Sequence, residues 1–421
     1  MAAMPDADCA AMTVPLLPRP TCLSVSFSST SFASSSSSSS TTSASSSPHS
    51  AFPPPQPQGP CKALAVLRDH AGSVSCLSLC GEFLLSASTG GDIVAWQQPD
   101  LRRFARFGHG ENGGSVKALA AAGKRVFSAH QDGCVCVWRV SRRSRSENAF
   151  KLVAALPTAR DYLGRVFRQA SYVQTTAWCS HRRLWIEHAD SISCLAVAAT
   201  VHNAALLYSG SWDRTLKVWR IADLKCLESI RAHDDTVNAV AADAGVVYSG
   251  SADGRGVLVA RDGVSWNALA VATADRRVYA AGSDSHVAGW DRLDGRTAAR
   301  WTLACDVKAH DMAVLCLCVV RDMLCTGCAD KTIGLWRRQS GGELAKVGVI
   351  GGHEGPVKCI QASWCRLSNG CMVYSGSLDK TIRVWWVPGA LQHDNGNEQQ
   401  QQQEKSFKDR NHNEKASLFL R

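Results

Sequence analysis

The stretch Y-S-G-S-W-D-R-T-L-K-V-W, from Tyr208 to Trp219, decides the fold of this chain. A serine lies ten residues before its closing tryptophan, and an aspartate lies six residues before it. Related stretches occur at Leu84–Trp96, Phe127–Trp138, Val247–Val259, Tyr279–Trp290, Leu324–Trp336 and Tyr374–Trp385. Self-similarity at this spacing indicates a repeat architecture, in which each unit buries its faces only against its neighbours.

A histidine and a strand-like run precede most copies, so each clear unit holds a histidine, a hydroxyl, an aspartate and a tryptophan. The complete sets are His188, Ser209, Asp213 and Trp219; His310, Thr326, Asp330 and Trp336; and His353, Ser375, Asp379 and Trp385. A further unit supplies Ser128, Asp132 and Trp138. The pattern resembles the WD repeat, whose four strands form one blade of a β-propeller. The resemblance implies a structural hydrogen-bond network that runs from histidine and aspartate through the hydroxyl to the indole.

Histidine, serine and aspartate could also be read as a hydrolase triad. A catalytic triad occurs once and needs a cleft, whereas this set recurs in register with a tryptophan attached. We therefore interpret it as structural and expect no catalytic residues, so the protein is predicted not to be an enzyme.

Seven units can be counted, which predicts an all-β, seven-bladed WD40 propeller. We expect a disordered Ser/Pro-rich leader over 1–60, the propeller over 61–388 and a disordered Gln-rich tail over 389–421. Cys61–Arg68 is strand-like and is expected to complete the last blade, which removes free sheet edges.

One unit is short. From Ser209 to Ser249 there are 40 residues, but from Ser249 to its counterpart Ala280 there are only 31. The missing length falls after Val259, where an outer strand should lie. An internal deletion or a wrong gene boundary would explain it, and either predicts a weak point with an exposed third strand.

Another unit is expanded. Trp138 and His188 are 50 residues apart, whereas Trp219 and His233 are 14 apart. We expect Arg183–Glu187 to be the outer strand after a basic insertion over about 139–183. Residues 139–187 carry a net charge of +7, out of +10 for the whole chain.

The basic insertion is either a solvated loop or a docking surface for an acidic or phosphorylated partner. Its candidate docking residues are Arg142, Arg143, Arg145, Arg182 and Arg183. Ser141, Ser144 and Ser146 lie among the arginines, so phosphorylation there would cancel much of the positive field. Nucleic-acid binding is disfavoured because aromatic residues are sparse in the insertion.

The 18 cysteines do not indicate a disulfide framework, because no secretory signal precedes them. Cys76, Cys194, Cys316 and Cys359 occupy the same register in their units, which predicts core packing. Cys325 and Cys328 form a C-x-x-C, but they lie within one predicted strand and no second pair has zinc-finger spacing. We expect neither a metal nor a cofactor.

The longest apolar run near a repeat, Val314–Val320, is much shorter than a membrane span. We therefore expect a monomer without membrane contact, in the cytoplasm, the nucleus or both. The serine-rich leader also resembles a plastid transit peptide, but Asp6, Asp8 and the lack of arginine in the serine tract argue against that location.

Within the insertion, Leu156-Pro157-Thr158, Tyr172-Val173 and the run from Leu184 to Asp190, L-W-I-E-H-A-D, resemble plant JINGUBANG-type WD-repeat proteins. The resemblance implies a regulatory scaffold without catalysis, in signalling or development. A different class remains open, a substrate receptor of a cullin-type ubiquitin ligase, which often carries W-D-x-R. Here Trp290-Asp291-Arg292-Leu293 has leucine in place of the arginine. A nucleic-acid-associated regulator is the third alternative.

Overall fold

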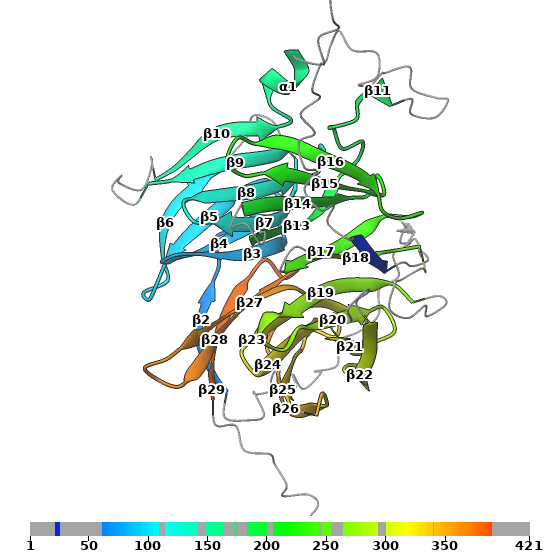
Figure 1. The fold of residues 1–421 in the computed structure, drawn as a ribbon. Coiled ribbons are helices and arrows are strands. Elements are labelled where there is room, and N and C mark those ends of the chain that lie inside the picture. Colours follow the sequence, from blue (N-terminus) through cyan, green and yellow to red (C-terminus); the bar gives the residue numbers. More distant parts are fainter. Residues whose placement is uncertain are drawn as a thin grey trace, which may run out of the picture.

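The computed structural model describes residues 22–25, 61–108, 114–141, 149–163, 172–173, 183–199, 205–243, 246–253, 264–293, 300–339 and 341–389. Nearly all of them lie in antiparallel sheets that are arranged around a ring (Figure 1). The innermost strands of the sheets in the ring are neighbours of one another around it.

Six of the sheets have four strands, and we name each blade by its innermost strand. The β3 blade contains β3 (Val74–Cys80), β4 (Phe83–Ser88), β5 (Ile93–Gln97) and β6 (Arg102–Phe107). The β7 blade contains β7 (Val116–Ala122), β8 (Arg125–His130), β9 (Val135–Val140) and β10 (Phe150–Leu156). The β13 blade contains β13 (Ile192–Ala199), β14 (Ala205–Ser211), β15 (Thr215–Arg220) and β16 (Lys225–Arg231).

The other three blades lie in the C-terminal half. The β19 blade contains β19 (Trp266–Ala272), β20 (Arg277–Gly282), β21 (His286–Leu293) and β22 (Arg300–Lys308). The β23 blade contains β23 (Val314–Val320), β24 (Met323–Cys328), β25 (Ile333–Arg338) and β26 (Leu344–Ile350). The β27 blade contains β27 (Val357–Cys365), β28 (Gly370–Ser377), β29 (Ile382–Pro388) and β2 (Lys62–Leu67).

The prediction of seven blades is wrong, because the described residues form six four-stranded blades. Between the β13 and β19 blades lies a three-stranded sheet, the β17 sheet, in the order β1-β18-β17. Its strands are β17 (Val237–Asp243), β18 (Val246–Ser251) and β1 (Cys22–Val25). The physical reason is chain length, since only 14 residues (252–265) separate β18 from β19.

The predicted third strand up to Val259 lies outside the described residues, and β1 pairs in parallel with β18 at that place. β1 also lies within the leader for which we predicted disorder, and the rest of that leader is outside the described residues. The predicted Gln-rich tail is likewise outside them, except for Gly389.

Ring closure by the first strand of the propeller is confirmed. β2 pairs antiparallel with β29, so a strand from the start of the chain becomes the outer strand of a blade built from its end. This pairing joins segments about 320 residues apart and leaves the β27 blade without a free edge at β29.

The predicted outer strand Arg183–Glu187 is wrong. The outer strand of the β7 blade is β10, which pairs with β9 and buries Phe150 and Leu156 at its two ends. Arg183–Leu184 instead forms β12, which pairs with β11 (Tyr172–Val173) in a separate two-stranded sheet. The helix α1 (Ala159–Leu163) follows β10, and Figure 1 shows α1 and β11 beyond the ring.

The repeated cysteines are buried in the core, as predicted. Three of them stand opposite the glycine of the repeated S-G motif, in the pairs Cys194–Gly210, Cys316–Gly327 and Cys359–Gly376. A Cβ atom on any of these glycines would lie only 2.5–2.7 Å from the facing sulfur atom. The thiol therefore fills the space that the missing side chain leaves.

Candidate functional site

The β13 blade holds the most complete chain of buried hydrogen bonds, which we call a relay. Trp219 Nε1 donates to Ser209 Oγ at 3.0 Å, and the two atoms Ser209 Oγ and His188 Nε2 are 2.8 Å apart. His188 Nδ1 lies 3.0 Å from Asp213 Oδ2. The indole can only donate and the carboxylate can only accept, so the hydroxyl must donate to Nε2 and Nδ1–H must donate to Asp213. The neutral imidazole with its proton on Nδ1 satisfies every partner.

The surroundings fix the protonation state of this relay. Burial lowers the pKa of His188 and outweighs the opposing effect of Asp213. Burial would raise the pKa of Asp213, but hydrogen bonds from His188 and Thr215 outweigh it and hold that pKa well below its usual range. The relay therefore combines a neutral imidazole with an ionised carboxylate at neutral pH.

The β23 and β27 blades repeat this geometry. In the β23 blade the tryptophan–hydroxyl, hydroxyl–histidine and histidine–aspartate distances are 3.1, 2.7 and 2.9 Å. In the β27 blade they are 2.9, 2.8 and 2.8 Å. The residues concerned are Trp336, Thr326, His310 and Asp330, and Trp385, Ser375, His353 and Asp379.

The β3 blade has a relay that sequence reasoning missed. Gly90 stands at the usual aspartate position, but Asp92, two residues later, lies 3.1 Å from His70 Nδ1. His70 Nε2 lies 2.7 Å from Ser86 Oγ, to which Trp96 Nε1 donates at 2.8 Å. The signal was an acidic residue four positions before the tryptophan, where the three complete units have threonine.

The β7 blade, for which the sequence predicted Ser128, Asp132 and Trp138, takes its histidine from one of its own strands. Trp138 Nε1 donates to Ser128 Oγ at 2.9 Å, and Ser128 Oγ lies 2.8 Å from His130 Nε2. His130 belongs to β8 itself and not to a loop before the innermost strand. Asp132 accepts a hydrogen bond from the backbone N–H of Cys134 at 2.9 Å, so it stabilises the turn.

Two sheets hold incomplete relays. In the β17 sheet, His233 Nε2 lies 2.9 Å from Ser249 Oγ and His233 Nδ1 lies 3.3 Å from Asp253 Oδ2. In the β19 blade, Ala280 replaces the hydroxyl residue. Among the described residues, the buried Nε1 of Trp290 has no hydrogen-bond partner. The missing hydroxyl explains this orphaned donor.

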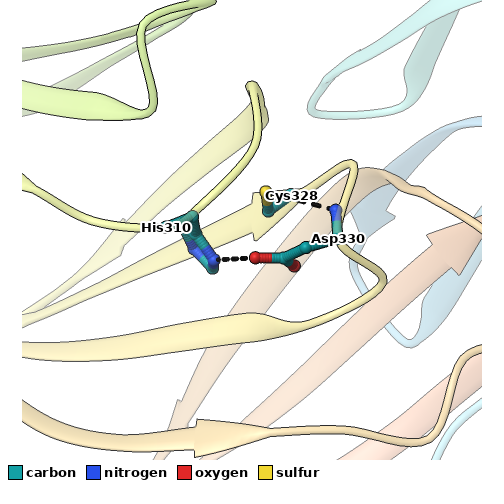
Figure 2. Close-up of side chains that lie close together, drawn as sticks. All are labelled: His310, Cys328 and Asp330. Atoms are coloured by element: carbon teal, nitrogen blue, oxygen red, sulfur yellow. Dashed lines mark hydrogen bonds and ion pairs between the residues drawn. The ribbon is translucent and has the colours of Figure 1, made fainter.

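His310, Cys328 and Asp330 form a cluster whose possible ligand atoms all lie within 4.8 Å of one another (Figure 2). Both imidazole nitrogens already have partners, Asp330 on Nδ1 and Thr326 on Nε2. Cys328 donates to the carbonyl of Met312 at 3.2 Å, and burial raises the pKa of its thiol to about 12. A neutral thiol is a poor metal ligand.

The β13 and β27 blades have a serine at the position that Cys328 occupies in the β23 blade, and that serine shows what the side chain does there. Ser211 and Ser377 each donate to a loop carbonyl, at 3.0 and 2.9 Å, and each accepts from the backbone N–H of the relay aspartate at 3.1 Å. Cys328 makes the same two contacts, since it accepts from the N–H of Asp330 at 3.3 Å. The cluster therefore follows from the repeat, with cysteine in the place of serine.

The predicted docking arginines lie almost entirely outside the described residues. Arg142, Arg143, Arg145 and Arg182 are not described, and only the backbone of Arg183 is placed, in β12.

The end of the insertion is anchored in the core. Leu184 and Ile186 are buried between the β7 and β13 blades. Lys217 in β15 is only 2% exposed, and its Nζ donates to the carbonyl of Trp185 at 2.7 Å and to Ser229 Oγ at 2.6 Å. Burial lowers the pKa of this ammonium group.

The turns between second and third strands, together with the loops that enter the innermost strands, form one face of the ring, which we call the turn face. Trp212, Met312 and Leu378 lie in these connections and are 41%, 53% and 44% exposed. Lys117 Nζ lies 5.8 Å from the centre of the Trp212 ring. Burial, and then the charge of Lys358, lower the pKa of Lys117. Exposed apolar side chains and two lysines therefore share this face.

The W-D-x-R-like sequence from Trp290 to Leu293 forms the end of a strand and pairs within its sheet. Trp290 and Asp291 lie in β21, and Asp291 Oδ2 accepts a hydrogen bond from Arg277 Nη2 at 2.8 Å. This arrangement gives no specific support to the ligase-receptor alternative.

Comparison with known proteins shows where the chain has relatives. The family model for the WD domain, G-beta repeat (WD40) matches residues 61–97, 179–220, 224–256, 301–337 and 344–385. The chain is 26% identical over 206 residues to "Small ribosomal subunit protein RACK1y" of Oryza sativa subsp. japonica, covering 48% of this chain and 49% of that protein. It is 26% identical over 203 residues to "Ribosome biogenesis protein WDR12 homolog" of Nematostella vectensis, covering 47% and 44%.

A solved structure of U3-55K has the same fold, with a TM-score of 0.54 at 15% identity, over 77% of this chain and 98% of that chain. The matches to curated relatives span about half of their length or less. In the described part of the chain, no helix is long and apolar enough to cross a membrane. The repeated motif, the ring of sheets and the matching segments agree, and the chain contains WD40 repeats over the matched segments.

Proposed function

We propose that this protein is a non-enzymatic scaffold that binds other proteins through its turn face. The observation that carries the proposal is the combination of Trp212, Met312 and Leu378 exposed on one face of a ring in which the histidine and aspartate of each complete relay are paired with one another. Exposed apolar side chains beside charged ones are typical of the centre of a binding surface. The buried relays stabilise the ring and leave that face free for binding.

The partner that fits this face is acidic or phosphorylated. The positive charges of Lys117 and Lys358 are close enough for one to lower the pKa of the other, and a bound anion would relieve that repulsion. The basic insertion with Arg142, Arg143, Arg145, Arg182 and Arg183 adds positive charge to the chain. Electrostatic complementarity of this kind mainly accelerates association and selects partners.

The insertion motifs support a narrower identity within WD40-repeat proteins. On the residues from Leu184 to Asp190 and on Leu156-Pro157-Thr158, we place the chain with the plant JINGUBANG-type proteins, acting in signalling or development in the cytoplasm or nucleus. Two relatives carry names that refer to the ribosome. A nucleic-acid-associated role is therefore the second candidate.

Affinity purification with quantitative mass spectrometry tests the proposed scaffold function. Wild type is compared with the double variant Lys117→Glu/Lys358→Glu, with Trp212→Ala, and with the rim control Leu303→Glu, whose leucine is 54% exposed on β22. We expect the turn-face variants to lose a shared set of partners that the rim control keeps. Identical partner sets in all four samples would contradict the proposal.

A salt titration separates protein partners from nucleic acid. Binding to nucleic acid weakens steeply between low and moderate salt because phosphate contacts release counterions. We expect the partners lost in the lysine variants to remain after nuclease treatment. Loss of those partners on nuclease treatment would favour the second candidate.

A further inference from the structure

The β17 sheet is too short to complete itself. In the β13 blade, 25 residues (212–236) separate β14 from the next innermost strand, and they hold both β15 and β16. After β18, only 14 residues (252–265) remain before β19. That length holds at most one strand with its two turns, so the chain cannot form a four-stranded blade at this place.

The edge of β18 needs a partner. All six of its residues are buried, and Ser249 takes part in the incomplete relay with His233. On one side β18 pairs with β17 from Val246 to Ser251. Without a strand on the other side, every second backbone N–H and C=O group would be left unpaired in a buried strand, which costs free energy.

β1 fills this place. Cys22, Leu23, Ser24 and Val25 pair in parallel with Val247, Tyr248, Ser249 and Gly250. The run Leu23-Ser24-Val25 has the apolar–polar–apolar pattern of Leu216-Lys217-Val218 in a regular third strand. Both edges of β18 are thus paired over these four residues.

We propose that the leader segment Cys22–Val25 docks within its own chain as a donated strand that completes the β17 sheet. The proposal is independent of the function proposed for the turn face. The 36 residues between Val25 and Lys62 can extend over about 120 Å. A domain of this size has a radius of gyration of about 20 Å, so the leader can reach β18 from the start of β2. The donated strand runs parallel to β18, whereas a regular third strand runs antiparallel.

Hydrogen–deuterium exchange on the full-length protein tests this docking. The variant Leu23→Pro/Ser24→Pro removes two backbone donors and restricts the extended segment. We expect the amides of β18 that face β1 to exchange roughly tenfold faster or more, while those of β14 remain protected. The matched control Ser36→Pro/Ser37→Pro places the same two prolines in the serine tract of the leader and should leave β18 unchanged.

The possible outcomes decide between the alternatives. Unchanged exchange in β18, or an equal change in the control, overturns the proposal. If protection of β18 rises with protein concentration, the strand comes from a second copy and the intramolecular form is wrong. If the proline variant also loses protection in β14, a synthetic peptide covering residues 18–29 is added. Restored protection of β18 supports strand donation, and no restoration overturns it.

Discussion

At the scale of single residues, the relays tie the sequence pattern to stability. Each complete relay joins four polar side chains into one buried unit in which every donor has an acceptor, as His188 and Asp213 show. Loss of one member leaves the others buried without partners, and that costs more than the bond itself contributes.

Asp213→Ala should lower the free energy of unfolding by about 1–3 kcal/mol, because His188 Nδ1 and the N–H of Ala189 both lose their acceptor. Chemical denaturation of the purified protein measures this. The control Asp223→Ala breaks an exposed ion pair with Arg220 and should leave the free energy of unfolding nearly unchanged. Equal effects of the two substitutions would refute a structural role for the relay.

Ala280→Ser should have the opposite effect. The new hydroxyl stands at the position from which serine binds the tryptophan indole in the other blades, and it would give the orphaned Nε1 of Trp290 an acceptor. We expect a gain of up to about 1 kcal/mol, measured as a raised denaturation midpoint. Ala281→Ser, one position along the same strand, adds a buried hydroxyl away from that register and should destabilise.

The stability of the fold should also decline in acid. The pKa of His188 is lowered on folding, so the unfolded state binds a proton first and stability falls as the pH drops below about 6.5. The pKa of Asp213 is lowered too, so its contribution, present above about pH 4, is lost as the pH falls further. Unfolding free energies measured from pH 7.5 to 5 should decrease. His188→Gln should reduce that slope, and an unchanged slope would exclude this residue as a source.

At the scale of elements, packing between blades depends on the pairing of a cysteine in the innermost strand with a glycine in the second strand. Gly376 lies opposite Cys359 in its own blade and beside Val74 of the β3 blade. The register therefore lets the side chain of one blade approach the backbone of the next.

Gly376→Ala should destabilise by about 1–3 kcal/mol, since its Cβ would lie 2.6 Å from both Cys359 Sγ and Val74 Cγ1. Adding Cys359→Ala should recover part of the loss, because it removes one of the two clashes. Gly348→Ala is the control, since its Cβ would meet no atom within 4 Å. Thermal denaturation of the four proteins checks the prediction, and a neutral Gly376→Ala would contradict it.

Local patterns predicted most elements, and the errors have physical causes. The tight units around Trp219, Trp336 and Trp385 are regular, so their strands and relays follow from spacing alone. β10 was missed because Arg183–Glu187 is also strand-like and lies closer to His188. The parts played by Asp92 and His130 depend on which side chains meet in space, and spacing along the chain does not reveal that.

At the scale of the whole molecule, the ring is held by two pairings that link distant segments. β2 closes the ring on β29, and β1 completes the β17 sheet. Counting the sequence units predicted seven blades, whereas six sheets have four strands among the described residues. A count of motifs does not test whether the chain after each motif is long enough to complete a four-stranded sheet.

Ring closure should contribute to global stability. Ala65→Pro/Val66→Pro removes two backbone donors from β2, and we expect the melting temperature to fall by several degrees. Val66→Ala keeps the backbone pairing and changes only a half-exposed side chain, so it should have a small effect. A proline variant that melts like wild type would mean that the ring is stable without its closing strand.

The contacts around Lys217 have a consequence for a cleaved chain. Leu184 and Ile186 are buried between the β7 and β13 blades, and the ammonium group of Lys217 donates a hydrogen bond to the carbonyl of Trp185. A protease cut between Leu163 and Arg183 would therefore sever the polypeptide without releasing either half. The nicked protein should migrate as one particle under native conditions and separate into two fragments only in detergent.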